Sequence, residues 1–423
     1  MNIILCTMGS RGDVEPYVAL GVELKKLGYD VFVSSPLVYQ ELIQNAQLNY
    51  IAINAVNPQD LLKIPEVEEA FAQGKRIKSM AILMKKSKSI VTDFLREMYN
   101  ATKGMDAVIA SMILYGAYDG AEKQGIPCFY GLLNPAVPTR EFPSVMTPHI
   151  PPYLNKLSHI CLEKGFWLFF KKACNRLRKT EWSLPKLTVC PAKIIRTRNL
   201  PILLGFSKAI VPKPTDWANE IITGYWLLEY DEKYDPDPEL VKFISSDENP
   251  PIYIGFGSMP IGDADRLLDM LQDALTISNQ KAVVFLSYNK AKLREKSERI
   301  FLTKQVPHNW LFPRVSAAVI HGGAGTCAAS MKAGIPTIVI PFMGDQTFWG
   351  EQIHKKGVGP KPVPFKKINS KILAELIKEA VTNKQMRENA RHLGEVLQKE
   401  NGSALAAAVI NEFLQNKNKK NYL

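Results

Sequence analysis

A glycine-rich turn directly after a short apolar run carries the clearest chemical signal in this 423-residue chain. The apolar run is residues 315–320, and the turn is His321-Gly322-Gly323-Ala324-Gly325-Thr326. Glycines lack Cβ and let a ligand approach the backbone. A helix that starts at such a turn also directs unpaired N–H groups toward the ligand. The turn therefore predicts a phosphate site, although a plain strand-to-helix turn without a ligand fits the glycines equally well.

Asp13 follows the first apolar run of the chain, residues 2–8. A carboxylate at the carboxyl edge of a sheet could take a proton from a substrate hydroxyl. The alternative is an acid that complements the positive end of a helix, which we expect to begin near Pro16. The sequence alone leaves both interpretations of Asp13 open.

Asp345 and Gln346 follow residues 341–344, which we interpret as the end of a strand. A carboxylate next to a carboxamide can accept and donate hydrogen bonds to the vicinal hydroxyls of a sugar. A second glycine turn, Gly255-Phe256-Gly257-Ser258, adds a hydroxyl at the first strand of the second half.

No metal site is expected. Asp263-Ala264-Asp265 matches a DxD pattern formally, but it precedes a helix, and a capping role is favoured. The cysteines are scattered without a CxxC pair, as in a reduced cytosolic protein; they are Cys6, Cys128, Cys161, Cys174, Cys190 and Cys327.

The formal net charge of +12 has basic residues spread along the chain, which argues against nucleic acid as a partner. An anionic substrate or an anionic membrane surface remains open. The N-terminus lacks a signal peptide pattern, and no run reaches the roughly 18 apolar residues of a membrane span. We therefore expect a cytoplasmic protein, at most peripheral on a membrane.

Residues 154–179 predict a basic helix with a dense aromatic run at 166–170. Basic residues beside aromatic side chains can lie on an anionic lipid surface. The favoured interpretation is instead that the aromatic side chains pack on the domain core.

Apolar runs of strand length alternate with helical stretches in both halves of the chain, which is typical of parallel sheets with helices on both faces. Prolines and acids gather in residues 213–250, so we interpret this segment as a linker region. The predicted domains are 1–212 and 251–402, with a terminal helix, 403–423, that joins the first. Both are expected to be Rossmann-like and doubly wound, facing across a cleft where ligands bind.

Two segments are long enough to compare with known families: GSRGDVEP at residues 9–16, and VPHNWLFPRVSAAVIHGGAGT with GIPTIVIPFMGDQTFWG within residues 306–350. Together they resemble the UDP-glycosyltransferase superfamily, in particular sterol 3-beta-glucosyltransferases and related bacterial antibiotic glycosyltransferases. The resemblance implies a GT-B-type fold, in which the first domain binds mainly the acceptor and the second mainly the nucleotide-sugar donor.

The resemblance also implies roles for individual residues. Asp13 would be the base that deprotonates the acceptor hydroxyl, next to the turn Gly9, Ser10, Arg11 and Gly12. Asp345 and Gln346 would bind the sugar. The diphosphate would be held by His321, Ser258 and the amides of Gly323, Ala324, Gly325 and Thr326. The nucleobase would be bordered by Val306, His308 and Trp310.

The function implied is inverting, metal-independent transfer of a hexose, glucose from UDP-glucose, to a hydroxyl of a hydrophobic acceptor such as a sterol. No cofactor is expected. A natural-product glycosyltransferase that uses a TDP- or UDP-sugar is the near alternative, and a nucleotide-sugar epimerase of the same fold is a more distant one. A non-catalytic lipid- or nucleotide-binding protein is disfavoured because Asp13, His321, Asp345 and Gln346 occur together.

Overall fold

The structure is a computed structural model that describes residues 1–54, 66, 88–198, 200–228, 234–246, 249–257, 259, 263–286, 297–303 and 306–417. The chain forms two compact units. The first comprises Met1–Lys208, Pro212–Leu228 and Asn401–Leu423, and the second comprises Ala209–Val211 and Glu229–Glu400.

The first unit contains a seven-stranded parallel sheet in the order β3-β2-β1-β4-β5-β6-β7. Its strands are β1 (Asn2–Cys6), β2 (Asp30–Pro36), β3 (Asn49–Ile53), β4 (Ala107–Ala110), β5 (Cys128–Leu132), β6 (Ile202–Leu204) and β7 (Glu220–Ile222). Its helices are α1 (Arg11–Lys26), α2 (Gln40–Asn45), α6 (Lys88–Ala101), α7 (Tyr115–Gln124), α8 (Asn155–Thr180), α9 (Pro191–Thr197) and α17 (Gly402–Lys417), with the short turns η1 (Leu37–Tyr39) and η2 (Pro152–Leu154).

The strand order of this sheet reverses between β1 and β4. Strands β2 and β3 extend the sheet on one side of β1, and β4 begins the extension on the other side, in register Ile3↔Val31 and Ile3↔Ala107. Ligands of open parallel sheets bind at such a reversal, outside the carboxyl ends of the strands. The turn after β1 therefore occupies the expected binding position of the first unit.

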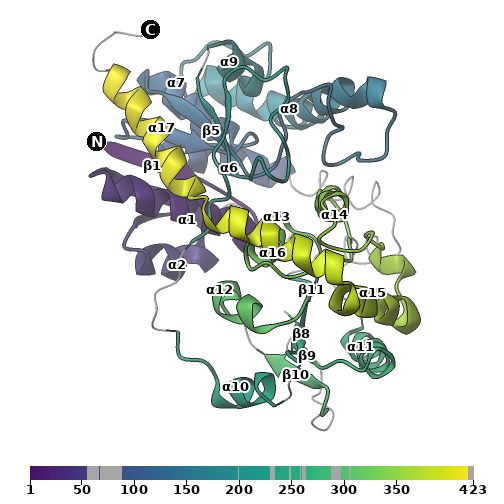
Figure 1. Ribbon diagram of the computed structural model, residues 1–423. Coiled ribbons are helices and arrows are strands. Elements are labelled where there is room, and N and C mark those ends of the chain that lie inside the picture. The colour runs from purple at the N-terminus through teal and green to yellow at the C-terminus, as the bar shows by residue number, and fades with distance from the viewer. Residues whose placement is uncertain are drawn as a thin grey trace. The chain divides into compact units, whose positions relative to one another are not determined.

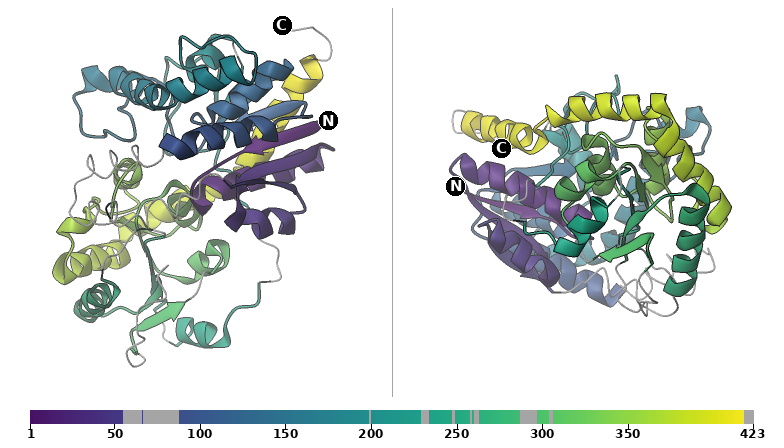
Figure 2. Two further views of the ribbon diagram at one scale, coloured as in Figure 1. Left: turned by 180° about the vertical axis from the view of Figure 1, so that it is seen from behind. Right: turned by 60° about the horizontal axis from the view of Figure 1, so that its bottom comes forward.

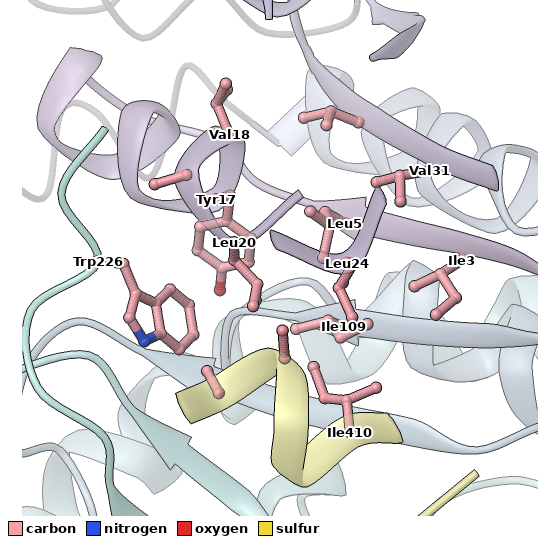
Figure 3. Packing of buried hydrophobic residues seen from close by; sticks show 14 of the residues in the cluster. Ile3, Leu5, Tyr17, Val18, Leu20, Leu24, Val31, Ile109, Trp226 and Ile410 are labelled. Atoms are coloured by element: carbon pink, nitrogen blue, oxygen red, sulfur yellow. The ribbon is translucent and has the colours of Figure 1, made fainter. Parts of the chain in front are cut away.

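One face of this sheet is covered by α1 and by α17 from the far end of the chain (Figure 1). Because strand side chains alternate between faces, Ile3 and Leu5 of β1 point to the same side as the apolar residues of α1 (Figure 3). Ile410 of α17 completes this cluster, and Tyr17 packs edge-on against Trp226. The core thus ties the position of α1 to strands and to the terminal helix.

The second unit contains a five-stranded parallel sheet in the order β10-β9-β8-β11-β12. Its strands are β8 (Ile252–Gly255), β9 (Ala282–Phe285), β10 (Ile300–Thr303), β11 (Ala318–Ile320) and β12 (Thr337–Val339). Its helices are α10 (Pro238–Ile244), α11 (Ala264–Ser278), α12 (His308–Leu311), α13 (Ala324–Lys332), α14 (Gln346–Lys355), α15 (Ser370–Thr382) and α16 (Lys384–Gln398), with the short turns η3 (Phe312–Arg314) and η4 (Phe365–Lys367). The strand order of this sheet reverses between β8 and β11.

The predicted class, α/β with two parallel doubly wound sheets, is confirmed. Three details differ from the sequence analysis. Helix α1 begins at Arg11 rather than near Pro16. Residues 220–222, placed in a linker, form the edge strand β7. The segment 341–344 lies after the end of β12 and is not part of a strand.

Helix α8 packs its aromatic side chains inward, as the favoured interpretation predicted. Trp167 and Phe170 are buried and meet the ring of Tyr115 edge-on, at centroid distances of 5.3 Å each. Leu168 between them points to solvent and is 68% exposed. In the part of the chain that the structure describes, no helix is long and apolar enough to cross a membrane.

Candidate functional site

The turn after β1 presents Asp13 in the first turn of α1. Ser10 is the N-cap of this helix, and Asp13 is its third residue, so the two form a capping box. Thr7 donates its hydroxyl to the Asp13 carbonyl at 2.8 Å and fixes the turn to the end of the strand. The helix therefore begins five residues before Pro16, because the Ser10–Asp13 pair supplies partners for the first backbone N–H groups.

Both donors of Ser10 reach the same oxygen of the Asp13 carboxylate. The backbone N–H donates to Oδ2 at 2.7 Å and the hydroxyl donates to Oδ2 at 2.8 Å. Among the described residues, Oδ1 accepts no hydrogen bond. Burial raises the pKa of Asp13, and the Ser10 hydrogen bonds offset part of that rise. The carboxylate is thus oriented by one oxygen, while the other is available to accept a proton.

Gly9 allows this arrangement. Its φ of +134° is unfavourable for residues with a side chain, and a Cβ there would lie 2.3 Å from Oδ2 of Asp13. Arg11 is engaged by Glu15 at 2.5 Å, and Gly12 is exposed on the helix surface. Of the four residues in this predicted turn, Gly9 and Ser10 thus directly determine the position of the Asp13 carboxylate.

In the second unit, His321 follows β11 at the reversal between β8 and β11. Its imidazole lies between two glycines that come from the two strand ends. A Cβ at Gly257 would lie 2.9 Å from Cε1 of the ring, and a Cβ at Gly323 would lie 2.6 Å from Nε2. Gly322 has φ of +94°, and a Cβ there would meet Val339 at 2.7 Å. Glycine is required at these positions by the fit of the imidazole and by the turn itself.

The imidazole of His321 is kept neutral by its surroundings. Burial lowers its pKa to about 4, and the nearby backbone of Gly255 offsets only part of this effect. Its Nδ1 is buried without a hydrogen-bond partner among the described residues. A buried polar atom of this kind costs free energy unless a water or a ligand satisfies it.

Helix α13 begins next to His321 with Gly323 as its N-cap, and no side chain caps this end. The amides of Ala324, Gly325 and Thr326 occupy the first turn, where backbone N–H groups lack intrahelical acceptors. These residues are only partly buried. The structure therefore places the predicted amides and His321 at one sheet edge, in the geometry that suits an anion. Ser258, predicted to assist, lies outside the described residues.

Asp345 and Gln346 lie at the start of α14, but they differ in their surroundings. Gln346 is buried, and its Oε1 accepts from the backbone N–H groups of Phe342 and Met343 at 2.7 and 2.9 Å. Its Nε2 contacts the sulfur of Met259 at 3.2 Å. Asp345 is partly exposed and accepts from the indole N–H of Trp349 at 3.1 Å. Gln346 thus holds the turn after β12, a role that the sequence did not indicate.

The three residues predicted at the nucleobase lie around α12. His308 stacks on Phe312 with ring centroids 4.4 Å apart. Trp310 is covered on one side by the guanidinium of Arg314, which lies 4.6 Å from the ring centroid. Val306 is partly exposed just before the helix. Helix α12 packs on α13, so this aromatic group borders the same helix as the anion-binding turn.

Asp263 is the N-cap of α11 and accepts from the backbone N–H of Arg266 at 3.1 Å, as expected for a cap. Within the described ranges, no group of three metal-ligating side chains occurs. Gly257 and Thr7 contribute to the two sites, although neither was a predicted site residue. Gly257 had a signal in its glycine turn, whereas nothing local distinguished Thr7.

This architecture is shared by solved structures of glycosyltransferases of the GT-B type. The glycotransferase of kitacinnamycin has a TM-score of 0.71 with 15% identity, covering 97% of this chain and 98% of that one. The glycosyltransferase SnogD from Streptomyces nogalater has a TM-score of 0.67 with 16% identity, covering 98% and 99%. At this level of identity the likeness defines the fold.

Family models and relatives define the sequence family. Residues 3–143 match the glycosyltransferase family 28 N-terminal domain, and residues 269–408 match the erythromycin biosynthesis protein CIII-like C-terminal domain. Sterol 3-beta-glucosyltransferases UGT80A2 and UGT80B1 of Arabidopsis thaliana are 31% and 30% identical, over 96% and 98% of this chain. The sterol 3-beta-glucosyltransferase of Pichia angusta is 32% identical over 96% of it.

The chain belongs to the UDP-glycosyltransferase superfamily, in the family that includes these sterol 3-beta-glucosyltransferases. It spans 64% and 68% of the length of the two Arabidopsis proteins and 33% of the Pichia protein. The resemblance stated from the two sequence segments is thereby confirmed.

Proposed function

We propose that this protein transfers a hexose, glucose from UDP-glucose, to a hydroxyl of a hydrophobic acceptor of the sterol type, with inversion at the anomeric carbon. The observation that carries the proposal is the glycine-flanked imidazole of His321, whose buried Nδ1 lacks a hydrogen-bond partner among the described residues, beside the uncapped start of α13. The relatives named for sterol glucosylation support the acceptor class.

In the second unit, the diphosphate of the donor would accept hydrogen bonds from the amides of residues 324–326 and from His321. The positive end of α13 stabilises the charge that develops on the departing diphosphate. No metal ion is needed in this scheme, because the helix and imidazole supply the stabilisation. Asp345, with one oxygen on Trp349, would bind hydroxyls of the sugar.

In the first unit, Asp13 would act as the general base. Its Oδ1 takes the proton of the acceptor hydroxyl, and the hydroxyl oxygen forms a bond to the anomeric carbon. The bond from that carbon to the diphosphate oxygen breaks, and its electron pair leaves with UDP. A pKa raised by burial makes the carboxylate a stronger base than an exposed aspartate.

A TDP-sugar is the second candidate donor, because a solved structure of the same fold, Streptomyces glycosyltransferase SsfS6, is complexed with thymidine diphosphate. Calorimetric titration with UDP and with TDP separates the two, and the tighter nucleotide identifies the donor class. A transfer assay with the matching glucose donor and a sterol then tests the reaction. Glucosylated sterol is the expected product, whereas interconversion of the nucleotide sugar without transfer would indicate an epimerase.

His321→Ala tests the donor site itself. Because the imidazole is expected to contact the diphosphate, we expect UDP affinity to fall by at least about tenfold, equivalent to one hydrogen bond to a charged group. His392→Ala, an exposed histidine on α16 of the same unit, is the matched control. Equal UDP affinity in both variants would refute the proposed site.

A further inference from the structure

The solvent-facing side of α8 carries apolar side chains in one half of its length and basic side chains in the other. Residues spaced by three or four positions face the same way on a helix. The exposed set at this spacing, called here the outer face of α8, is Leu157, Cys161, Lys164, Leu168, Lys172, Arg176 and Lys179. Its first half is mainly apolar and its second half is basic. Helix α8 lies at the periphery of its unit in Figure 1 and Figure 2.

The basic half of the outer face borders an open depression of about 590 Å³. This depression is lined by Leu168, Lys171, Lys172, Asn175, Arg176, Lys179, Thr180 and Lys186. Five of these eight side chains are cationic and none is acidic. Like charges repel, so such a gathering does not stabilise the fold, and its positive potential attracts an anionic partner.

Two acids near this surface form ion pairs with arginines outside the depression. Glu163, the acid within α8, is buried and pairs with Arg196 at 2.8 Å. Glu181 follows the helix and accepts from Nε and Nη2 of Arg96 at 2.9 and 2.6 Å. Besides Arg96, Arg176 of the depression also contributes to lowering the pKa of Glu181, so this carboxylate offsets part of the positive charge. Among the described residues, no ion pair joins Glu163 or Glu181 to the lysines of the depression.

Exposed apolar side chains stand beside this charge. Leu168 is 68% exposed at the edge of the depression, Leu157 is 52% exposed, and Tyr153 before the helix is 84% exposed. The inner face is fixed by Trp167 and Phe170 against Tyr115, so the outer side chains are not needed to hold the helix in place. Water-exposed leucines next to lysines fit an interface that is both apolar and anionic.

We propose that the outer face of α8 docks the protein on the surface of an anionic membrane. The basic residues contact lipid phosphates and carboxylates, and Leu157 and Leu168 enter the boundary between headgroups and acyl chains. A helix of 26 residues is about 39 Å long, which allows both halves to contact the bilayer surface at once. A polynucleotide would match the charge but leave the leucines in water, so lipid is favoured. This inference does not depend on the proposed reaction.

Flotation of the full chain with phosphatidylcholine vesicles, with and without phosphatidylserine, tests the proposal. We expect binding only with phosphatidylserine and weaker binding at high salt, because screening shortens the reach of surface charges. Lys172→Glu with Lys179→Glu should lower the bound fraction at least about tenfold, since each cation near an anionic surface contributes severalfold. Leu168→Gln leaves the charge unchanged but should still lower the bound fraction below that of the wild type, because the exposed leucine is lost.

Lys371→Glu with Lys378→Glu on α15 changes the net charge equally at exposed positions elsewhere and serves as the matched control. This control should float like the wild type, and thermal melting should show all variants folded. Equal losses in the two double variants would mean a general effect of charge and would overturn the proposal. So would wild-type protein that ignores phosphatidylserine vesicles but binds an RNA oligonucleotide.

Discussion

Ser10 holds one oxygen of Asp13 with two hydrogen bonds, from its backbone N–H at 2.7 Å and from its hydroxyl at 2.8 Å. The sequence analysis treated helix capping and base catalysis as competing roles for this carboxylate. The two hydrogen bonds use the same atom, Oδ2, so a capping carboxylate can still present Oδ1 to a substrate. The two roles are therefore compatible in one side chain.

Asp13→Asn separates these roles. The amide oxygen can still accept from Ser10, so the start of α1 should stay folded, but an amide cannot take a proton. Loss of a general base lowers the rate typically 10²- to 10⁴-fold, and we expect a loss of about this size in sterol transfer. UDP affinity, measured by calorimetry, should change less than about twofold, because the proposed diphosphate contacts lie in the second unit. A twofold change in affinity corresponds to about 0.4 kcal/mol.

Asp263→Asn is the matched control, because Asp263 also caps a helix but does so at the start of α11 in the second unit. It should keep wild-type turnover. Near-normal turnover in Asp13→Asn would remove Asp13 from the mechanism, whatever its effect on stability.

The buried imidazole of His321 predicts a dependence of stability on pH. Its pKa in the folded protein is about 4, below the ordinary value of 6.5, so the unfolded chain binds the proton first as pH falls. The stabilisation is complete above about pH 6.5 and is lost as pH falls toward 4. At about pH 5 the loss from this group is about 2 kcal/mol, because pH 5 lies about 1.5 units below the ordinary pKa of 6.5 and each unit corresponds to 1.36 kcal/mol.

Urea unfolding of wild type and His321→Gln at about pH 7.5 and pH 5 measures this contribution, since the other titrating groups cancel in the comparison. The free energy of unfolding of the wild type should fall by about 2 kcal/mol more than that of the variant. Parallel losses in both proteins would show that His321 titrates normally.

Gly323→Ala tests whether the imidazole needs the space that glycine leaves. The φ of Gly323 is −63°, which alanine adopts without strain, so the main effect is the new methyl 2.6 Å from Nε2 of His321. Displacement of the ring should lower UDP affinity at least about tenfold, as for loss of a hydrogen bond to a charged group. Gly165→Ala on α8, where a Cβ would meet nothing within 4 Å, is the control. Unchanged UDP binding in Gly323→Ala would argue against a role for the ring in that position.

The sequence was sufficient for the parts of the fold that have strong local signals. Runs such as residues 2–8 are apolar and end at a glycine turn, and the placement of this run as a parallel strand was correct, with β1 covering Asn2–Cys6. Strands β6 and β7 have three residues each, too few to show a period, and they depend on pairing with β5 and with each other. Such strands are determined by tertiary contacts rather than by local pattern.

The same division holds for the candidate site. His321 and the amides of α13 were predicted because a glycine turn between a strand and a helix is a local pattern. The flanking of the ring by Gly257 was not predicted, because it requires knowing that β8 pairs with β11. The helix start at Arg11 was missed because Pro16 suggested a first turn, whereas the Ser10–Asp13 capping box stabilises an earlier one.

Gln346 provides the last test, because the structure gives it a role beyond sugar binding. Its Oε1 accepts from two backbone N–H groups, at Phe342 and Met343, and the side chain is only 5% exposed. Gln346→Ala leaves both donors without this acceptor, and each unsatisfied buried group costs about 1–3 kcal/mol. Two such groups give an expected loss of about 2–6 kcal/mol in the free energy of unfolding, measured with urea.

Gln346→Glu keeps an oxygen acceptor for both N–H groups and should recover most of that loss in stability. Asp345→Asn is the neighbouring control. It should keep near wild-type stability, because an amide oxygen still accepts from Trp349. A stable Gln346→Ala protein with lowered affinity only for the sugar donor would mean that the side chain serves the ligand rather than the turn. An unstable Gln346→Ala protein whose stability is restored by Gln346→Glu would instead show that the Gln346 side chain stabilises the turn after β12. That turn then determines where Asp345 lies.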